Sequence, residues 1–214
     1  MLVVDICPTI DAEDSDTYRK QVERIIPFAH RVHIDLGDGT FTPNTLVSID
    51  QVWWPGGMRA DLHVMYKRPF EHLESLIALG PQLIIVHAEA EGDFPGFVKH
   101  VHQHGIEAGV ALLQRTPVET IMPALEFIDH VLIFSGNLGH QGGSHADLKL
   151  LEKVTAIKKI RPNVEVSWDG GVNEQNIAQI VAAGVEVVNV GAYLQHADSP
   201  EKSYESLRGA LGVS

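Results

Sequence analysis

Short apolar runs alternate with amphipathic segments along the whole chain. Eight runs have the length and composition of buried strands, and they lie at residues 2–6, 31–36, 59–65, 82–87, 106–113, 129–134, 163–169 and 185–190. Segments with the spacing of helices that have one apolar face lie at residues 14–28, 46–52, 69–79, 94–104, 117–126, 147–161, 173–183 and 199–210. Apolar strands separated by helices predict a parallel sheet whose outer face is covered.

Two architectures contain such a sheet: an open doubly wound sheet and a closed barrel. Eight strand–helix repeats within 214 residues, with no linker or low-complexity segment between them, favour the closed form. We therefore predict an α/β fold, a (β/α)8 TIM barrel, that forms a single domain over residues 1–214. Active sites of this fold lie at the carboxyl ends of the strands, so the polar residues at those ends indicate the chemistry.

Histidine and aspartate side chains occur at four of these strand ends. His33 and Asp35 share a face of the second strand, because side chains alternate along a strand, while His63 ends the third strand and Asp169 the seventh. Two imidazoles and two carboxylates that converge on one barrel mouth would bind a divalent metal such as zinc, iron, manganese or cobalt. A simple His33–Asp35 hydrogen bond is the alternative. His87, at the end of the fourth strand, is either a further ligand or a core histidine with its own partner.

Glycine clusters follow each of the last three strands. They lie at residues 137–143, 169–173 and 190–192. One such cluster is weak evidence, because glycine is common in turns. Three at neighbouring strand ends predict a phosphate site, since barrels often bind phosphate with the backbone of these loops. His140 and His145, beside the first cluster, either contact that phosphate or lie on the surface.

The composition limits the partners. The net charge of −12 and the pI of about 5.4 argue against nucleic acid and against an anionic membrane surface. A single cysteine excludes an internal disulfide. We find no signal peptide, and no apolar stretch approaches the ~20 residues of a membrane span. We therefore expect a cytoplasmic protein that acts on a small molecule.

Several stretches resemble the ribulose-phosphate 3-epimerase family. They are HIDLGDGTFTPN at 33–44, DLHVM at 61–65, GVAL at 109–112 with Thr116-Pro117, and DGGVN at 169–173. The resemblance implies a barrel of the ribulose-phosphate-binding type. It also implies that one divalent metal is held by His33, Asp35, His63 and Asp169, and that the two aspartates are the acid and base. By the same resemblance, the substrate-binding positions are Thr9, Met65, Gly139, Gly142, Gly143, Gly170, Gly171, Gly191 and Ala192.

This assignment agrees with the chemistry. Inverting C3 of a ketose phosphate removes the proton alpha to the carbonyl and returns one from the opposite face, which needs two carboxyl groups. We expect Asp35 to act as base towards one epimer and Asp169 as the acid that reprotonates it. A bound metal would stabilise the negative charge that develops. The simplest reaction would be the interconversion of D-ribulose 5-phosphate and D-xylulose 5-phosphate.

Some positions depart from the family's pattern. Methionine is usual where Gly37 and Phe134 stand, the loop 137–143 differs at several positions, and Ala192 replaces a serine. The alternatives are therefore another ketose phosphate, such as D-allulose 6-phosphate, or a sugar-phosphate-binding relative without activity. A decarboxylase or aldolase of related barrels is disfavoured, because no strand end carries the lysine of their Asp-x-Lys-x-x-Asp motif. Related barrels self-associate, so we expect a homo-oligomer.

Overall fold

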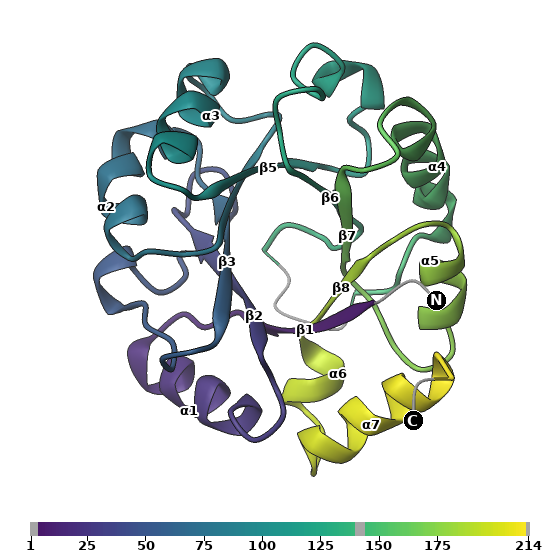
Figure 1. The fold of residues 1–214 in the computed structure, drawn as a ribbon. Coiled ribbons are helices and arrows are strands. Elements are labelled where there is room, and N and C mark those ends of the chain that lie inside the picture. Colours follow the sequence, from purple (N-terminus) through teal and green to yellow (C-terminus); the bar gives the residue numbers. More distant parts are fainter. Residues whose placement is uncertain (1–3, 140–143, 213–214) are drawn as a thin grey trace.

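Eight parallel strands close into a barrel, with helices around its outside (Figure 1). The computed structural model describes residues 4–139 and 144–212. The strands are β1 (Asp5–Ile10), β2 (Arg31–Gly37), β3 (Arg59–Met65), β4 (Leu83–His87), β5 (Glu107–Leu112), β6 (His130–Phe134), β7 (Glu165–Asp169) and β8 (Val187–Val190). Each strand pairs with its neighbours in sequence, and β8 pairs with β1 to close the ring. The predicted (β/α)8 barrel is confirmed.

Helices follow most strands and cover the barrel. They are α1 (Ser15–Ile25), α2 (Leu73–Ala78), α3 (Phe94–Gln103), α4 (Leu151–Ile160), α5 (Ile177–Ala182), α6 (Ala192–Gln195) and α7 (Pro200–Ala210). Short 3-10 turns lie at Ile49–Gln51, Pro69–His72, Val118–Ile121 and Leu148–Leu150. Within the described part of the chain, no helix has both the length and the apolar character that a bilayer span requires.

Several elements differ from the prediction, including the helix predicted at 46–52, which is only the 3-10 turn Ile49–Gln51. The first strand begins at Asp5 and continues to Ile10, whereas residues 2–6 were predicted. The strand continues through Pro8 because β1 stops pairing with β8 and begins pairing with β2 at this residue, so its missing N–H costs little. The predicted helix 117–126 is only the turn Val118–Ile121, because Pro123 cannot continue a helix. The four-residue helix α6 is too short to show a period in the sequence.

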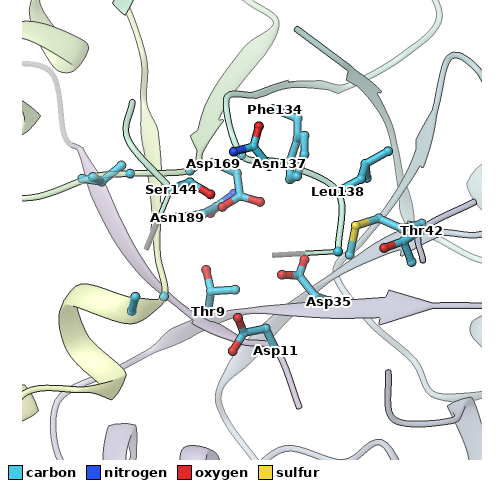
Figure 2. A pocket seen from close by; sticks show the side chains of 18 of the residues that line it. Thr9, Asp11, Asp35, Thr42, Phe134, Asn137, Leu138, Ser144, Asp169 and Asn189 are labelled. Atoms are coloured by element: carbon cyan, nitrogen blue, oxygen red, sulfur yellow. The ribbon is translucent and has the colours of Figure 1, made fainter. Parts of the chain in front are cut away.

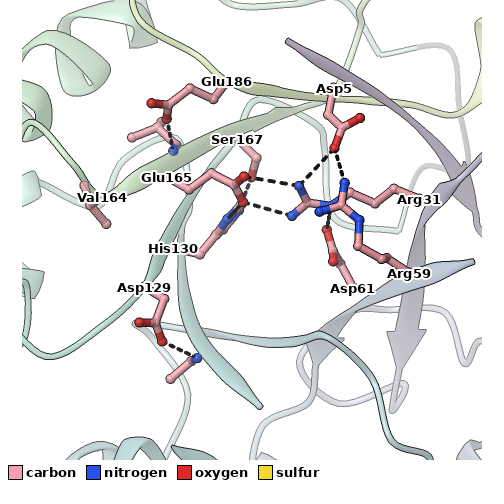
Figure 3. Close-up of polar contacts among 12 residues, drawn as sticks. Asp5, Arg31, Arg59, Asp61, Asp129, His130, Val164, Glu165, Ser167 and Glu186 are labelled. Carbon is pink, nitrogen blue, oxygen red and sulfur yellow. Dashed lines mark hydrogen bonds and ion pairs between the residues drawn. The ribbon is translucent and has the colours of Figure 1, made fainter. Parts of the chain in front are cut away.

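The amino-terminal end of the barrel is closed by buried charges (Figure 3). The Arg31 side chain is 3% exposed and donates to Asp61 at 2.8 Å and to Glu165 at 2.9 Å, with Asp5 at 3.4 Å. His130 lies 2.7 Å from Glu165. Burial alone would raise the pKa of Glu165, but His130 and Arg31 hold it well below its usual range. These paired charges fill this end of the barrel, and the cavity described below lies at the opposite end.

A small apolar cluster separates the two ends inside the barrel. It consists of Leu83, Ile85, Ala111, Leu132 and Phe134, all pointing inward from β4, β5 and β6. These side chains pack as in any buried core, and they lie directly beneath the residues at the carboxyl ends of the strands.

Candidate active site and metal centre

The four residues predicted as metal ligands come together at the carboxyl end of the barrel. One ligand atom from each of His33, Asp35, His63 and Asp169 lies within 4.8 Å of all the others, and all four residues are buried. His63 Nδ1 is 2.7 Å from Asp35 Oδ1, and His33 Nε2 is 3.3 Å from the same oxygen. Asp169 Oδ2 is 3.8 Å from His33 Nε2 and 3.9 Å from His63 Nδ1.

Strand register produces this arrangement. Asp35 of β2 stands opposite His63 of β3, and His33 lies two residues earlier on the same inward face of β2. Asp169 is the last residue of β7, and its partner in the sheet is Asn189 of β8. Figure 2 shows Asp35 and Asp169 entering one cavity from different sides. Asp35 and Asp169, more than 130 positions apart in the chain, therefore lie close together because the carboxyl ends of the strands surround the same end of the barrel.

The cluster suits a divalent cation. His33 is completely buried, yet neither of its ring nitrogens makes a hydrogen bond within the described residues. An unpaired buried nitrogen is costly, unless a cation takes the place of the missing partner. Two imidazole nitrogens and two carboxylates form a donor set that zinc, iron, manganese and cobalt all accept.

The two carboxyl groups differ in acidity. Burial alone would raise the pKa of Asp35, but the imidazoles of His33 and His63 hold it well below its usual range. Burial, followed by repulsion from Asp35, raises the pKa of Asp169. Repulsion between neighbouring carboxylates disfavours the ionisation of both. Asp35 is therefore the carboxyl that ionises more readily and Asp169 the one that is protonated more readily, which suits the two partners of a two-base proton transfer.

A cavity of about 410 Å³ opens above the cluster (Figure 2). Seven of the nine predicted substrate-binding residues line it: Thr9, Met65, Gly139, Gly170, Gly171, Gly191 and Ala192. Gly142 and Gly143 lie outside the described residues, as does His140. His145 lines the cavity, whereas His87 does not. The protein thus provides a cavity large enough for a small metabolite, directly over the four candidate metal ligands.

Close packing of two loops explains the glycines after β7. Gly170 and Gly171 have φ angles of +110° and +72°. A Cβ at Gly170 would lie 2.3 Å from the Gly136 nitrogen, and one at Gly171 would lie 2.2 Å from the Ala146 nitrogen. Only glycine fits at both positions. The loop after β7 therefore lies directly against the loop after β6, and their backbones form one wall of the cavity.

The packing around Gly37 and Phe134, the two positions where methionine is usual, explains the residues found there. A Cβ at Gly37 would lie 2.7 Å from Thr42 Cγ2 and 3.1 Å from Leu46 Cγ. Thr42 and Leu46 both line the cavity, so they occupy the space that a longer side chain at position 37 would need. The Phe134 ring lies 5.7 Å from that of His63, between ring centroids. Phe134 therefore packs directly against a predicted ligand.

Sequence reasoning missed two polar residues of the cavity wall, Asp11 and Asn189. Asn189 is 2% exposed, and neither polar atom of its amide has a hydrogen-bond partner within the described residues. The same holds for the Thr9 hydroxyl. Because unpaired buried polar groups are costly, these atoms are suited to bind a polar ligand. A signal was available: Asn189 is the only amide in the apolar run 185–190, and Asp11 continues the alternation of β1 two residues after Thr9.

Asp11 gives a prediction of pH-dependent stability. Burial, followed by repulsion from Asp35, raises its pKa to about 7, although Gln21 donates a hydrogen bond to it at 3.3 Å. The folded protein therefore holds this proton more tightly than the unfolded chain, and the stability that this proton contributes is lost as the pH rises towards 7. We expect Asp11→Asn to gain ~2 kcal/mol relative to the parent between pH 4.5 and pH 8, about half of what three pKa units represent.

Urea unfolding of the metal-free proteins at the two pH values measures this difference. Comparing the variant with its parent cancels the other groups that titrate over the same range. A difference in stability that is the same at both pH values would show that Asp11 ionises normally in the folded protein.

Comparisons with known proteins agree with this geometry. A sequence profile described as the ribulose-phosphate 3 epimerase family matches residues 5–195. The ribulose-phosphate 3-epimerase of Schizosaccharomyces pombe is 28% identical over 99% of this chain and 95% of its own. That of Helicobacter pylori is 30% identical over 95% of this chain and 96% of its own. Among solved structures, a 3-hexulose-6-phosphate synthase superposes with a TM-score of 0.72 at 19% identity, covering 99% of this chain and 100% of that one. This last likeness shows the barrel fold alone.

Proposed function

This chain belongs to the ribulose-phosphate 3-epimerase family, and we propose on that basis that it inverts C3 of a ketose phosphate. Its named relatives are isomerases that act on carbohydrates. The simplest substrates are D-ribulose 5-phosphate and D-xylulose 5-phosphate. The observation that carries the proposal is the pair Asp35 and Asp169, which face one cavity with opposite preferences for a proton.

The two carboxyls divide the work of the reaction. Ionised Asp35 removes the C3 proton from one face of the ketose, and protonated Asp169 returns a proton to the other face. The reverse reaction exchanges these roles. A divalent cation held by His33, Asp35, His63 and Asp169 would polarise the substrate oxygens and offset the negative charge that develops at C2 and C3. His33 and His63 favour the ionised form of Asp35, which can accept a proton.

The cavity wall suits a phosphorylated polyol. No lysine or arginine lines the cavity in the described part of the chain, so backbone N–H groups of the glycine loops at 170–171 and 191–192 are the groups that would bind phosphate. Thr9 lies beside the second of these loops, since its Cβ is 3.6 Å from the position of a Cβ on Gly191, and it pairs in the sheet with the candidate ligand His33. The unpaired polar atoms of Thr9 and Asn189 would bind sugar hydroxyls. Binding the phosphate at one end then places C3 between the two carboxyls.

Solvent deuterium provides the direct test. The proton that returns to C3 comes from a carboxyl that has exchanged with solvent, so we expect each turnover in D2O to place deuterium at C3. NMR of the recovered ketose phosphate measures this incorporation. Samples without protein provide the background. Protein that incorporates no deuterium with any pentulose or hexulose phosphate would instead be a binding protein without this activity.

The cavity also supports a second candidate, a hexulose 6-phosphate such as D-allulose 6-phosphate. Asp11 and Asn189 add hydrogen-bonding groups beside Thr9, and a hexulose carries one more hydroxyl for them than a pentulose does. A comparison of kcat/KM for the two sugar phosphates decides between them, because specificity is expressed in that ratio.

A further inference from the structure

A chain of hydrogen bonds leads from His63, one of the four candidate metal ligands, into the barrel wall behind it. His63 Nε2 lies 2.8 Å from His87 Nε2, and His87 Nδ1 lies 3.3 Å from Glu89 Oε2. The other oxygen of Glu89 accepts from the Leu113 N–H at 3.1 Å and from the Thr116 hydroxyl. Glu89 is therefore an acceptor with fixed donors, and it terminates the chain on the side away from the cavity.

The short contact between the two histidine rings allows only two assignments of the shared proton. If His87 donated it, His87 would need a second proton on Nδ1 to face the Glu89 carboxylate. It would then be a cation that is 2% exposed, which is costly. In the other assignment His87 is neutral: its Nδ1–H donates to Glu89, and His63 Nε2–H donates to His87. This second assignment satisfies His87 and Glu89 without burying a charge on His87.

This assignment fixes which nitrogen of His63 faces the other candidate metal ligands. It is Nδ1, which lies 2.7 Å from Asp35 Oδ1, so a cation bound there would meet the ring at Nδ1. The chain from Glu89 therefore orients His63 as a ligand.

Aromatic rings hold the same histidines in place. Phe41 lies 4.7 Å from His87, and Phe134 lies 5.9 Å from His87 and 5.7 Å from His63, between ring centroids. Apolar rings on this side offer no alternative hydrogen-bond partner to His63 Nε2. His87 is thus the acceptor on which the orientation of His63 depends.

We propose that Glu89 and His87 are positioning residues, which act through hydrogen bonds to hold His63 in the tautomer and orientation that bind the divalent metal. This inference rests on the metal centre of the proposed function and assigns residues beyond its four ligands. His87 is then neither a fifth ligand nor an ordinary core histidine. Outer partners of this kind commonly contribute 10- to 100-fold to metal affinity.

Metal affinity is the first test, using Zn2+ and the full chain in competition with a chromophoric chelator. We expect Glu89→Gln and His87→Phe to weaken Zn2+ binding by roughly 10- to 100-fold. His87→Gln keeps an acceptor for His63 Nε2–H and should restore most of the affinity. Glu74→Gln is the matched control, since it removes the exposed His100–Glu74 pair at 2.8 Å and should bind Zn2+ as the parent does.

The tautomer of His63 is the second test, and it needs no substrate. In 15N NMR spectra of the Zn2+-loaded parent we expect hydrogen on His63 Nε2 and none on Nδ1. In Glu89→Gln and His87→Phe we expect the Nδ1–H form to appear. An Nδ1–H tautomer in the parent, or Zn2+ affinities within about twofold of the parent in both variants, would overturn the inference. Neither measurement depends on deuterium exchange at C3, so it can fail while the epimerase proposal stands.

Discussion

Asp35→Asn and Asp169→Asn are each expected to lower the rate of C3 epimerisation by ~10³-fold or more, since general acid–base groups contribute 10²- to 10⁴-fold and each aspartate also binds the metal. An amide of the same shape can neither accept nor return the C3 proton. Steady-state rates in both directions measure the loss. Circular dichroism should show an unchanged fold, because neither side chain contributes to the barrel's main apolar cluster.

Isotope exchange distinguishes the two variants from each other. Each retains one carboxyl, which can still remove and return a proton on its own face of the ketose. We expect slow C3 deuteration without inversion, confined to one epimer in Asp35→Asn and to the other epimer in Asp169→Asn. Asp16→Asn, on the exposed face of α1, is the matched control and should behave as the parent. Near-normal turnover in either active-site variant would refute the two-base assignment.

The sequence predicted the barrel because its signals repeat. Eight apolar runs separated by helices admit few topologies, and parallel pairing in chain order then follows. Errors occurred where one local signal was given too much weight. The first strand was predicted from the apolar run at 2–6, although it continues past Pro8, where β1 changes its partner strand. Residues 117–126 have helical spacing, yet Pro123 limits them to one turn.

The grouping of the four candidate metal ligands was predictable for a related reason. Strand ends of a barrel lie side by side, so His33, Asp35, His63 and Asp169 could be placed together without coordinates. The residues that support these ligands could not be placed in this way. Glu89 continues the alternation of β4 two residues after His87, but its role depends on hydrogen bonds to His87 and Leu113 that only three-dimensional packing defines. Asn189 looks like an isolated polar residue in a strand until the cavity beside it is seen.

Removing the metal is the other change with a large expected effect. We expect a protein treated with a strong chelator to lose its epimerase activity by ~10²-fold or more and to regain it with one equivalent of Zn2+, Mn2+, Co2+ or Fe2+. Without the cation, the charge that develops at C2 and C3 has no counter-charge, since no lysine or arginine lines the cavity in the described residues. Activity assays and metal analysis before and after reconstitution measure this result.

Stability gives a reading that is independent of turnover. A cation that binds only the folded chain at 100 times its dissociation constant adds ~2.7 kcal/mol, so the melting temperature should rise by several degrees. His63→Ala should lose this rise. His104→Ala should keep it, although His100 and His104 form an exposed pair with ring centroids 5.1 Å apart, which could itself attract a metal ion. If His104→Ala lost the rise and His63→Ala kept it, the cation would bind on α3, and the cluster at the barrel mouth would have to act without one.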